Sequence, residues 1–152
     1  MFINLSAISE GEWFPFRMST VNPDTGETIW GEEMPGVRVK IKSWKKFFEN
    51  SFLSREQIAE WKVHPKTHQN QKHINQKQMT PKEIIVQKED GIDYAILEWE
   101  GFKDKKTKKD IECNRENKIA MMSLDFFDRF FSDAQLSIDR KKIEEAEEKE
   151  KN

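Results

Sequence analysis

The chain has 152 residues, the length of one domain, since a typical domain has about 100–200. Hydrophobic and charged residues each make up 36% of it, so the apolar share is lower and the charged share higher than in an average globular protein. A net charge of −2 gives no general attraction to nucleic acid or to anionic membranes. Eleven Phe and five Trp can still form a modest core, because each aromatic side chain buries roughly 150–250 Å².

Three features indicate where the protein works. Cys113 is the single cysteine, which excludes an internal disulfide and a thiolate metal cluster and suits a reducing compartment. Residues 1–13 lack the basic start and the apolar run of a signal peptide. No stretch approaches the roughly 18 apolar residues that a membrane-spanning helix needs. We therefore expect a cytoplasmic protein that does not enter a membrane.

The first third of the chain has the pattern of a small antiparallel sheet over residues 12–43. Pro15, within an aromatic run, suits an edge strand. Residues 21–27 contain Pro, Asp and Gly in the order of a tight turn, and the apolar residues on both sides predict a hairpin. Residues 37–42 then alternate between apolar and basic types, which predicts a half-buried strand with a basic solvent face.

Helical patterns follow the predicted sheet. Residues 44–48 place aromatic side chains at i, i+3 and i+4. Residues 54–57 have the pattern of a capping box, and with Ile58 and Trp61 on one face they predict another helix. Periodicity stops there. Residues 62–82 hold five Lys and all three His with no acidic residue, so we expect a long, exposed, basic loop.

Order is predicted to resume at Thr80 and Pro81, a suitable helix start. Gly91 is a candidate interruption of this segment, and the helical part beyond it would end at Gly101 as its C-terminal cap. Its predicted buried stripe, at the spacing 0, 3, 4, 7, is Ile92, Ala95, Ile96 and Trp99. Asn114 and Ser123 are the expected N-caps of two more helices. The apolar stripe of the last helix is Phe127, Phe130, Phe131, Ala134 and Ile138.

These patterns predict an α+β protein, in which a small N-terminal antiparallel sheet (a hairpin plus one strand) precedes a mainly helical C-terminal half. Residues 1–138 are expected to form a single domain that includes the basic loop. Residues 139–152 carry six acids and five bases with little apolar content, so they form a charged tail, helical or disordered.

The three histidines are the candidate metal ligands. His64 and His68 have the i, i+4 spacing of a helical zinc pair, but no glutamate lies between them as in the zinc-protease motif, and Pro65 disfavours a helix there. A site with His73 would still lack a group that orients the rings. We expect no metal and no cofactor, and interpret these residues as polar loop residues.

The lysines of the same segment could contact phosphates, which requires only a basic cluster. The candidate contacts are Lys62, Lys66, Lys72 and Lys77. However, no aromatic residue lies between Lys62 and Lys82, so bases would have no stacking platform within the loop. A solvated or protein-contacting loop is the preferred interpretation, and nucleic acid is the alternative.

Catalytic chemistry finds little support in the sequence. Cys113 has no histidine within forty residues to act as its base, and it suits a small packed residue near a helix start. The six glycines are scattered and form no phosphate loop. Paired acids such as Glu32 and Glu33 lie in charged runs, where nothing suggests the burial that would shift their pKa. We therefore expect no enzyme.

The aromatic run near the C-terminus has two interpretations. At helical spacing it is most often core, yet four Phe in six residues, preceded by two Met, span more than one helix face. Met and aromatic residues are enriched at protein interfaces, so part of the run could dock a partner. The candidate partner-binding residues are Met121, Met122, Phe126, Phe127, Phe130 and Phe131.

The stretch from Tyr94 to Ile138 resembles the C-terminal part of tail assembly chaperones, small proteins encoded in the tail-morphogenesis region of tailed bacteriophages and prophages. The resemblance rests on an apolar run that ends in Trp99, the pair Gly101–Phe102, a charged turn, and a step into a short helix and a second, aromatic helix. Its matching residues are Ile96–Trp99, Gly101, Phe102, Lys103, Asp104, Glu112–Asn114, Glu116–Lys118, Phe126, Phe127 and Phe131. Its structural signature is Trp99, Gly101, Phe102, Asn114 and Asn117.

The resemblance covers about a third of the chain and has one clear departure, because residues 105–109 replace the usual Asp-Gly turn. It implies a protein that binds a tape-measure or tail-tube protein in the bacterial host cell until the tail polymerises. Two alternatives stay open: a small nucleic-acid-binding or regulatory protein of mobile-element origin that acts through residues 62–82, and a structural subunit that remains in the virion.

Overall fold

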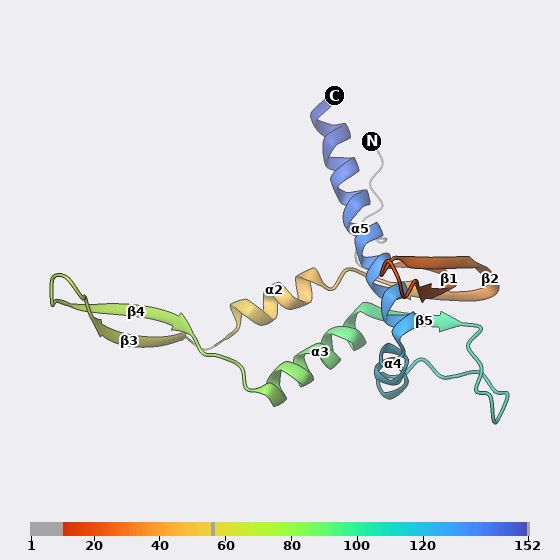
Figure 1. The fold of residues 1–152 in the computed structure, drawn as a ribbon, viewed down its shortest axis with the longest axis horizontal. Helices are drawn as coiled ribbons and strands as arrows, with labels where there is room; N and C mark the ends of the chain where they lie inside the picture. The colour runs from red at the N-terminus through yellow and green to blue at the C-terminus, as the bar shows by residue number, and fades with distance from the viewer. Residues whose placement is uncertain (1–10, 56, 152) are drawn as a thin grey trace.

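The computed structural model describes residues 11–55 and 57–151 (Figure 1). Its elements in chain order are β1 (Glu12–Val21), β2 (Thr28–Ile41), α2 (Lys45–Leu53), β3 (Gln57–Val63), β4 (Asn70–Gln76), α3 (Pro81–Ala95), β5 (Ile96–Glu100), α4 (Arg115–Met122) and α5 (Asp125–Lys151). An antiparallel sheet near the N-terminus and helices that lie mostly in the C-terminal half confirm the predicted α+β class.

The sheet has the order β1-β2-β5, and both pairings are antiparallel. The predicted turn joins β1 to β2: Asn22 Oδ1 accepts the amide of Asp24 at 2.9 Å, and Gly26 has a φ of +73°. The predicted strand at residues 37–42 is the end of the long strand β2, with Val39 and Ile41 buried. β1, which contains Pro15, is an edge strand, as predicted.

The third strand, β5, corrects a helix prediction. Helix α3 ends at Ala95, and the chain enters the sheet at Ile96. Glu98 pairs with Lys40 but Ile96 pairs with Ile41, so Leu97 is an extra residue in a bulge. Ile96 and Trp99 therefore both face the core although they are three residues apart, and their spacing imitated a helical stripe. Gly101 ends a strand and caps no helix, contrary to the prediction.

Helix α5 packs on the sheet and supplies much of the core, as its predicted stripe requires. Phe127 and Phe131 have no exposed surface, and Phe16 of β1 packs edge-on against Phe130 with ring centroids 5.0 Å apart. The buried hydrophobic cluster consists of Phe16, Val39, Ile41, Ile92, Ala95, Ile96, Trp99, Met122, Phe127, Phe130, Phe131 and Ala134. The core thus joins the sheet to α5 and to the C-terminal end of α3.

Two polar side chains of α5, not foreseen from the sequence, fix it to the sheet. Arg129 donates to the hydroxyl and the carbonyl oxygen of Ser19 at 2.8 and 2.9 Å. The buried Gln135 donates to the carbonyl oxygen of Lys42 at 2.9 Å and accepts from the amide of Trp44 at 3.4 Å. These bonds satisfy the carbonyl oxygen of Ser19 within β1 and backbone groups of Lys42 and Trp44 where the chain leaves β2, which removes the penalty of burying them unpaired.

Residues 45–95, which we call the arm, lead away from this core. Figure 1 shows α2 and α3 running outward side by side, with the β3–β4 hairpin beyond their far ends. The predicted loop at 62–82 is therefore wrong, since β3 and β4 form an antiparallel pair in which Val63 lies opposite Asn70. The predicted helix after Ser54 is also wrong, because Ser54 closes α2 by donating to the carbonyl oxygen of Ser51. Glu56 of that predicted capping box lies outside the described residues.

The base of the arm is tied to the core by aromatic contacts. Trp44 packs on Phe131 with centroids 4.7 Å apart, and Phe48 packs on Trp44 at 5.1 Å. At Gly91 of α3 a Cβ atom would lie 2.8 Å from the ring of Phe48, so glycine permits the close approach of α2 and α3. The predicted start of α3 is confirmed, since the Thr80 hydroxyl accepts the amide of Glu83.

Candidate partner-binding surface

The aromatic helix does not present the docking face that one interpretation of the sequence placed there. Met122, Phe127, Phe130 and Phe131 are buried in the core. Met121 and Phe126 are partly buried and pack against the same cluster. The burial supports the alternative interpretation, in which the run is core, and it leaves Met121 and Phe126 as the partly exposed members of this set.

The signature residues between Trp99 and Asn117 form a structural joint. Trp99 Nε1 donates to the carbonyl oxygen of Ile111 at 2.7 Å, which fixes the returning chain against β5. Asn114 caps α4, as predicted, by accepting the amide of Asn117 at 2.9 Å. The side chain of Asn117 in turn donates to the carbonyl oxygen of Glu112 at 2.9 Å. The predicted cap at Ser123 is wrong, because its hydroxyl donates to Ala120 at the end of α4.

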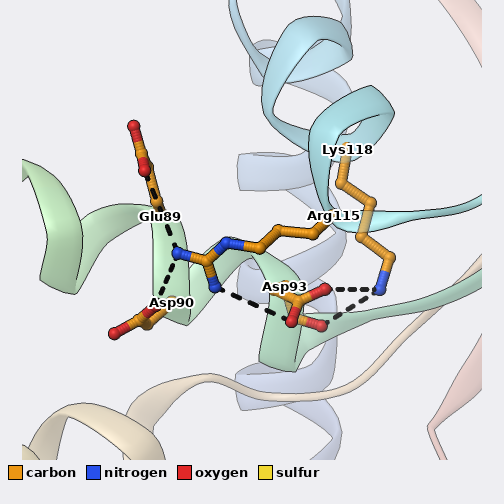
Figure 2. A network of polar contacts seen from close by, with 5 residues as sticks. All are labelled: Glu89, Asp90, Asp93, Arg115 and Lys118. Atoms are coloured by element: carbon orange, nitrogen blue, oxygen red, sulfur yellow. Dashed lines mark hydrogen bonds and ion pairs between the residues drawn. The ribbon is translucent and has the colours of Figure 1, made fainter.

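A network of charged residues locks α4 to α3 (Figure 2). The nearly buried Lys118 reaches the carbonyl oxygen and a carboxylate oxygen of Asp93 at 3.2 and 3.0 Å. Arg115 pairs with Asp90 at 2.6 Å, which raises the pKa of its guanidinium, and it lies within 4 Å of carboxylate oxygens of Glu89 and Asp93. Each carboxylate thus faces a cation, so the cluster holds the base of α3 in place.

The β3–β4 hairpin has two unlike faces. Residues paired across antiparallel strands share a face, and so do alternate residues along one strand. Ala59 lies opposite Ile74, Trp61 opposite Lys72, and Val63 opposite Asn70. The first face, which we call the hairpin face, therefore consists of Ala59, Trp61, Val63, Asn70, Lys72 and Ile74. The opposite face carries polar side chains, among them Lys62, Gln71 and His73.

The large side chains of the hairpin face are exposed. Trp61 is 68% exposed, Val63 60% and Ile74 61%, because no core lies against them. They belong to a wider pattern: eight of the fourteen exposed large hydrophobic residues in the described part of the chain lie between positions 52 and 86. The others in the arm are Phe52, Leu53, Ile84, Ile85 and Val86. Large apolar side chains that are exposed together on one segment are typical of interaction sites.

The predicted phosphate-binding lysines all lie on or beside the hairpin. Lys62 is in β3, Lys66 in its turn, Lys72 in β4, and Lys77 just beyond β4. The structure also places Trp61 directly opposite Lys72, a proximity that the interpretation as an unstructured loop missed. The alternation of apolar residues at 59, 61 and 63 is the sequence signal that could have revealed the strand.

The histidines lie around the same hairpin. His64 Nδ1 accepts the amides of Lys66 and Thr67 at 3.2 Å each, which builds the turn. His68 closes this turn with a φ of +53°. The helical i, i+4 pair considered from the sequence is thus a pair on either side of a tight turn. Within the described residues no group of three or more His, Cys, Asp and Glu could hold a metal ion.

A cavity of about 380 Å³ opens between α2 and α3 within the arm. Phe47 and Ser51 line it from α2, and Val86, Gln87 and Asp90 line it from α3. Gln87 Nε2 donates to the Ser51 hydroxyl across this space at 2.5 Å. Met79, Lys82 and Glu83 complete the lining, so the cavity combines apolar and charged walls.

No family model, no curated protein and no solved structure matches this chain. None of the described helices has both the length and the apolar character needed to cross a membrane.

Three ionisable groups in or beside the β1-β2-β5 sheet, Cys113, Arg38 and Glu100, have shifted pKa values with local causes. Partial burial raises the pKa of the Cys113 thiol, so the reactive thiolate is disfavoured near neutral pH. Glu100 accepts a hydrogen bond from Arg38 at 2.8 Å, which lowers the pKa of its carboxyl. Arg38 also stacks on Trp13, 4.0 Å from the ring centroid. These contacts join the outer sides of β1, β2 and β5.

Proposed function

We propose that the chain is a non-catalytic binding protein of a tailed bacteriophage or prophage, and that it holds a tail component in the cytoplasm of the bacterial host during tail assembly. The observation that carries the binding role is the arm, in which eight large apolar side chains are exposed far from the core. A folded domain that displays such surface on a projecting element is suited to cover apolar surface on another protein.

The identity of the partner rests on the resemblance of residues 94–138 to tail assembly chaperones. A tape-measure or tail-tube protein exposes apolar surface before it polymerises, and a binding protein with an apolar arm and a charged exterior would keep it dispersed. The joint from Trp99 to Asn117, which carries the resemblance, leads into α4. Arg115 and Lys118 of α4 hold the base of the arm through Asp90 and Asp93 of α3.

Co-expression with the tape-measure and the tail-tube protein from the same phage or prophage tests this proposal. We expect one of them to become soluble and to co-purify with this chain. If both stay insoluble with the folded chain present, the chaperone proposal fails. Mass spectrometry of purified particles separates a chaperone, which should be missing from virions, from a structural subunit, which should be present in them.

A second candidate function is nucleic-acid binding through the hairpin. The observation that favours it is Trp61 beside Lys72, which supplies an aromatic surface for stacking next to a cation. It predicts binding to any long DNA or RNA that weakens steeply as salt is added. A gel-shift with random DNA at two salt concentrations decides this, and absence of a shift at low salt removes the candidate.

A further inference from the structure

We propose that the hairpin face binds an acidic, apolar polypeptide segment, whose apolar side chains cover Trp61, Val63 and Ile74 while a carboxylate pairs with Lys72. This inference rests on the proposed binding function and deepens it, since it assigns the surface and the chemistry of the partner. Three properties of the hairpin carry it: an uncovered apolar face, a cation within that face, and the charge of the surrounding segment.

The first property is that the hairpin lacks the cover that such elements normally need. An isolated two-stranded hairpin is marginally stable in water, and stability usually comes from a third strand or from packing on an apolar face. The base of the hairpin is held by Gln76 Nε2, which donates to the carbonyl oxygen of Phe52 at 2.9 Å. Farther out, Trp61, Val63 and Ile74 are each at least 60% exposed. A partner on this face would supply the missing layer.

The second property is the position of Lys72. It lies directly opposite Trp61 and two residues from Ile74 on the same strand, so a cation interrupts the apolar surface. A purely apolar partner would remove water from this ammonium group without pairing it, which is unfavourable. A partner with a carboxylate at this point would satisfy it by a charge-assisted hydrogen bond.

The third property is the charge of the whole segment. Residues 61–82 contain five Lys and three His and no acidic residue. The hairpin itself, Gln57–Gln76, has three Lys and one acid, Glu60, so it is net positive. Two copies packed through the hairpin face would bring their Lys72 side chains and their net positive hairpins together, which opposes a symmetric dimer. An acidic partner gains from the same charges both in encounter rate and in selectivity.

The composition of the face favours a polypeptide over nucleic acid. Its members beside Trp61 and Lys72 include Ala59, Val63 and Ile74, which neither pair with phosphates nor offer a flat ring for base stacking. Aliphatic residues on one face of a strand instead match the alternate apolar side chains of another extended segment. Protein recognition therefore uses the whole face, whereas nucleic acid would use only part of it.

Fluorescence anisotropy with labelled peptides and the full-length chain tests the inference. The probe is an extended peptide in which Leu and Phe alternate with Glu. One control peptide has Lys in place of every Glu, and a second has Ser in place of every Leu and Phe. We expect the Glu peptide to bind most tightly. Each control peptide should bind at least about tenfold more weakly, the equivalent of 1.4 kcal/mol.

Variants of the hairpin face locate the binding. Ile74→Ser and Lys72→Glu should each weaken binding of the probe by at least about tenfold, as substitutions at an interface centre do. Matched controls are Ile29→Ser, at a 55% exposed strand position of β2, and Lys105→Glu, at an exposed loop position. Both controls should bind like the unchanged chain. Thermal unfolding confirms that each variant is folded, because all four positions are exposed.

Several results would overturn the inference. Equal binding of the Glu and Lys peptides would show that the partner need not be acidic. Unchanged binding by folded Ile74→Ser and Lys72→Glu would show that the hairpin face is not the binding surface. Displacement of the probe by random DNA at physiological salt would assign the face to nucleic acid. A dimer in sedimentation that Ile74→Ser dissociates would assign it to a second copy.

Failure of this inference is distinguishable from failure of the proposed function. If a tail protein co-purifies equally with Ile74→Ser, Lys72→Glu and the unchanged chain, the tail-binding function stands and the hairpin face is not its surface. If the acidic peptide binds as expected while neither tail protein co-purifies, the face stands and the assignment to tail assembly fails.

Discussion

Gly101 shows most directly how a single residue fixes the junction between the sheet and the rest of the chain. Its φ is +88°, and a Cβ atom there would overlap the carbonyl oxygen of Gly36 and approach Val37. The sequence identified Gly101 as a position that needs glycine but assigned it to a helix end. The requirement is real and comes from the close approach of the β5 end to the neighbouring strand.

Gly101→Ala should lower the free energy of unfolding by about 2–4 kcal/mol, because left-handed strain and steric overlap add. Gly26→Ala is the matched control: its φ is +73°, yet nothing lies within 4 Å of the added atom. It should lower stability by about 1 kcal/mol, the strain alone. Urea unfolding of both variants measures the difference, and equal losses would contradict the close packing at Gly101.

Cys113 gives a prediction for pH. Partial burial raises the pKa of its thiol, so the folded state holds the proton more tightly than the unfolded state does. The resulting stability is present below the unfolded pKa of about 8.5 and is lost as the pH rises toward the folded pKa. Iodoacetamide, which reacts with the thiolate, should therefore alkylate the folded chain at pH 8 more slowly than the urea-unfolded chain. Equal rates would contradict the burial.

At the scale of elements, α5 is better explained as core than as a docking helix. Phe127 has no exposed surface and packs against Phe16, Trp99 and Phe102. Phe127→Ala should lower the free energy of unfolding by about 3–5 kcal/mol, as truncation of a buried Phe does. Phe127→Leu should remain folded and should co-purify with a tail partner like the unchanged chain. If folded Phe127→Leu no longer co-purifies with the tail partner, α5 takes part in docking and the assignment to the core alone is wrong.

The junction of α3 and α4 depends on Lys118. Lys118→Met keeps the length of the side chain but removes its two contacts with Asp93, and should lower the free energy of unfolding by about 1–2 kcal/mol. Lys45→Met is the control, since its pair with Asp139 is exposed on the Lys45 side and should contribute less than about 0.5 kcal/mol. Thermal unfolding compares the two, and equal shifts would show that the network in Figure 2 adds nothing.

The elements that the sequence predicted are those with local signals. The turn at Asn22–Gly26 and the caps at Thr80 and Asn114 form through side chains a few residues away, so local patterns revealed them. β5 was missed because a bulge gives it helical spacing, which depends on pairing with a strand more than fifty residues earlier. β3 was missed because a capping-box pattern at residues 54–57 precedes it and favoured a helix, and β4 was missed because Ile74 is its single apolar residue.

At the scale of the whole molecule, the buried core and the exposed apolar side chains lie in different parts of the chain. The sheet and the first half of α5 contain the buried aromatic side chains, whereas the arm carries most of the large exposed hydrophobic side chains of the described residues. In Figure 1 the hairpin lies at the opposite end of the molecule from the sheet. The candidate site could not be predicted from the sequence, because exposure of Trp61 and Ile74 follows from this arrangement and not from any local motif.

This separation implies that the hairpin opens more easily than the core. Its backbone hydrogen bonds lie in a two-stranded ribbon with both edges in solvent, and local opening is frequent where few buried apolar contacts hold an element. A partner that covers the hairpin face would close these openings, so binding should be visible at the backbone as well as at the side chains.

Hydrogen exchange of the chain alone and in complex with a co-purified tail protein is the most direct test that the arm is the binding surface. We predict that amides of residues 57–76 exchange at least about tenfold more slowly in the complex, while those of β1, β2 and α5, already protected by the core, change little. Slowing confined to β1, β2 or α5, with residues 57–76 unchanged, would contradict the assignment of binding to the arm.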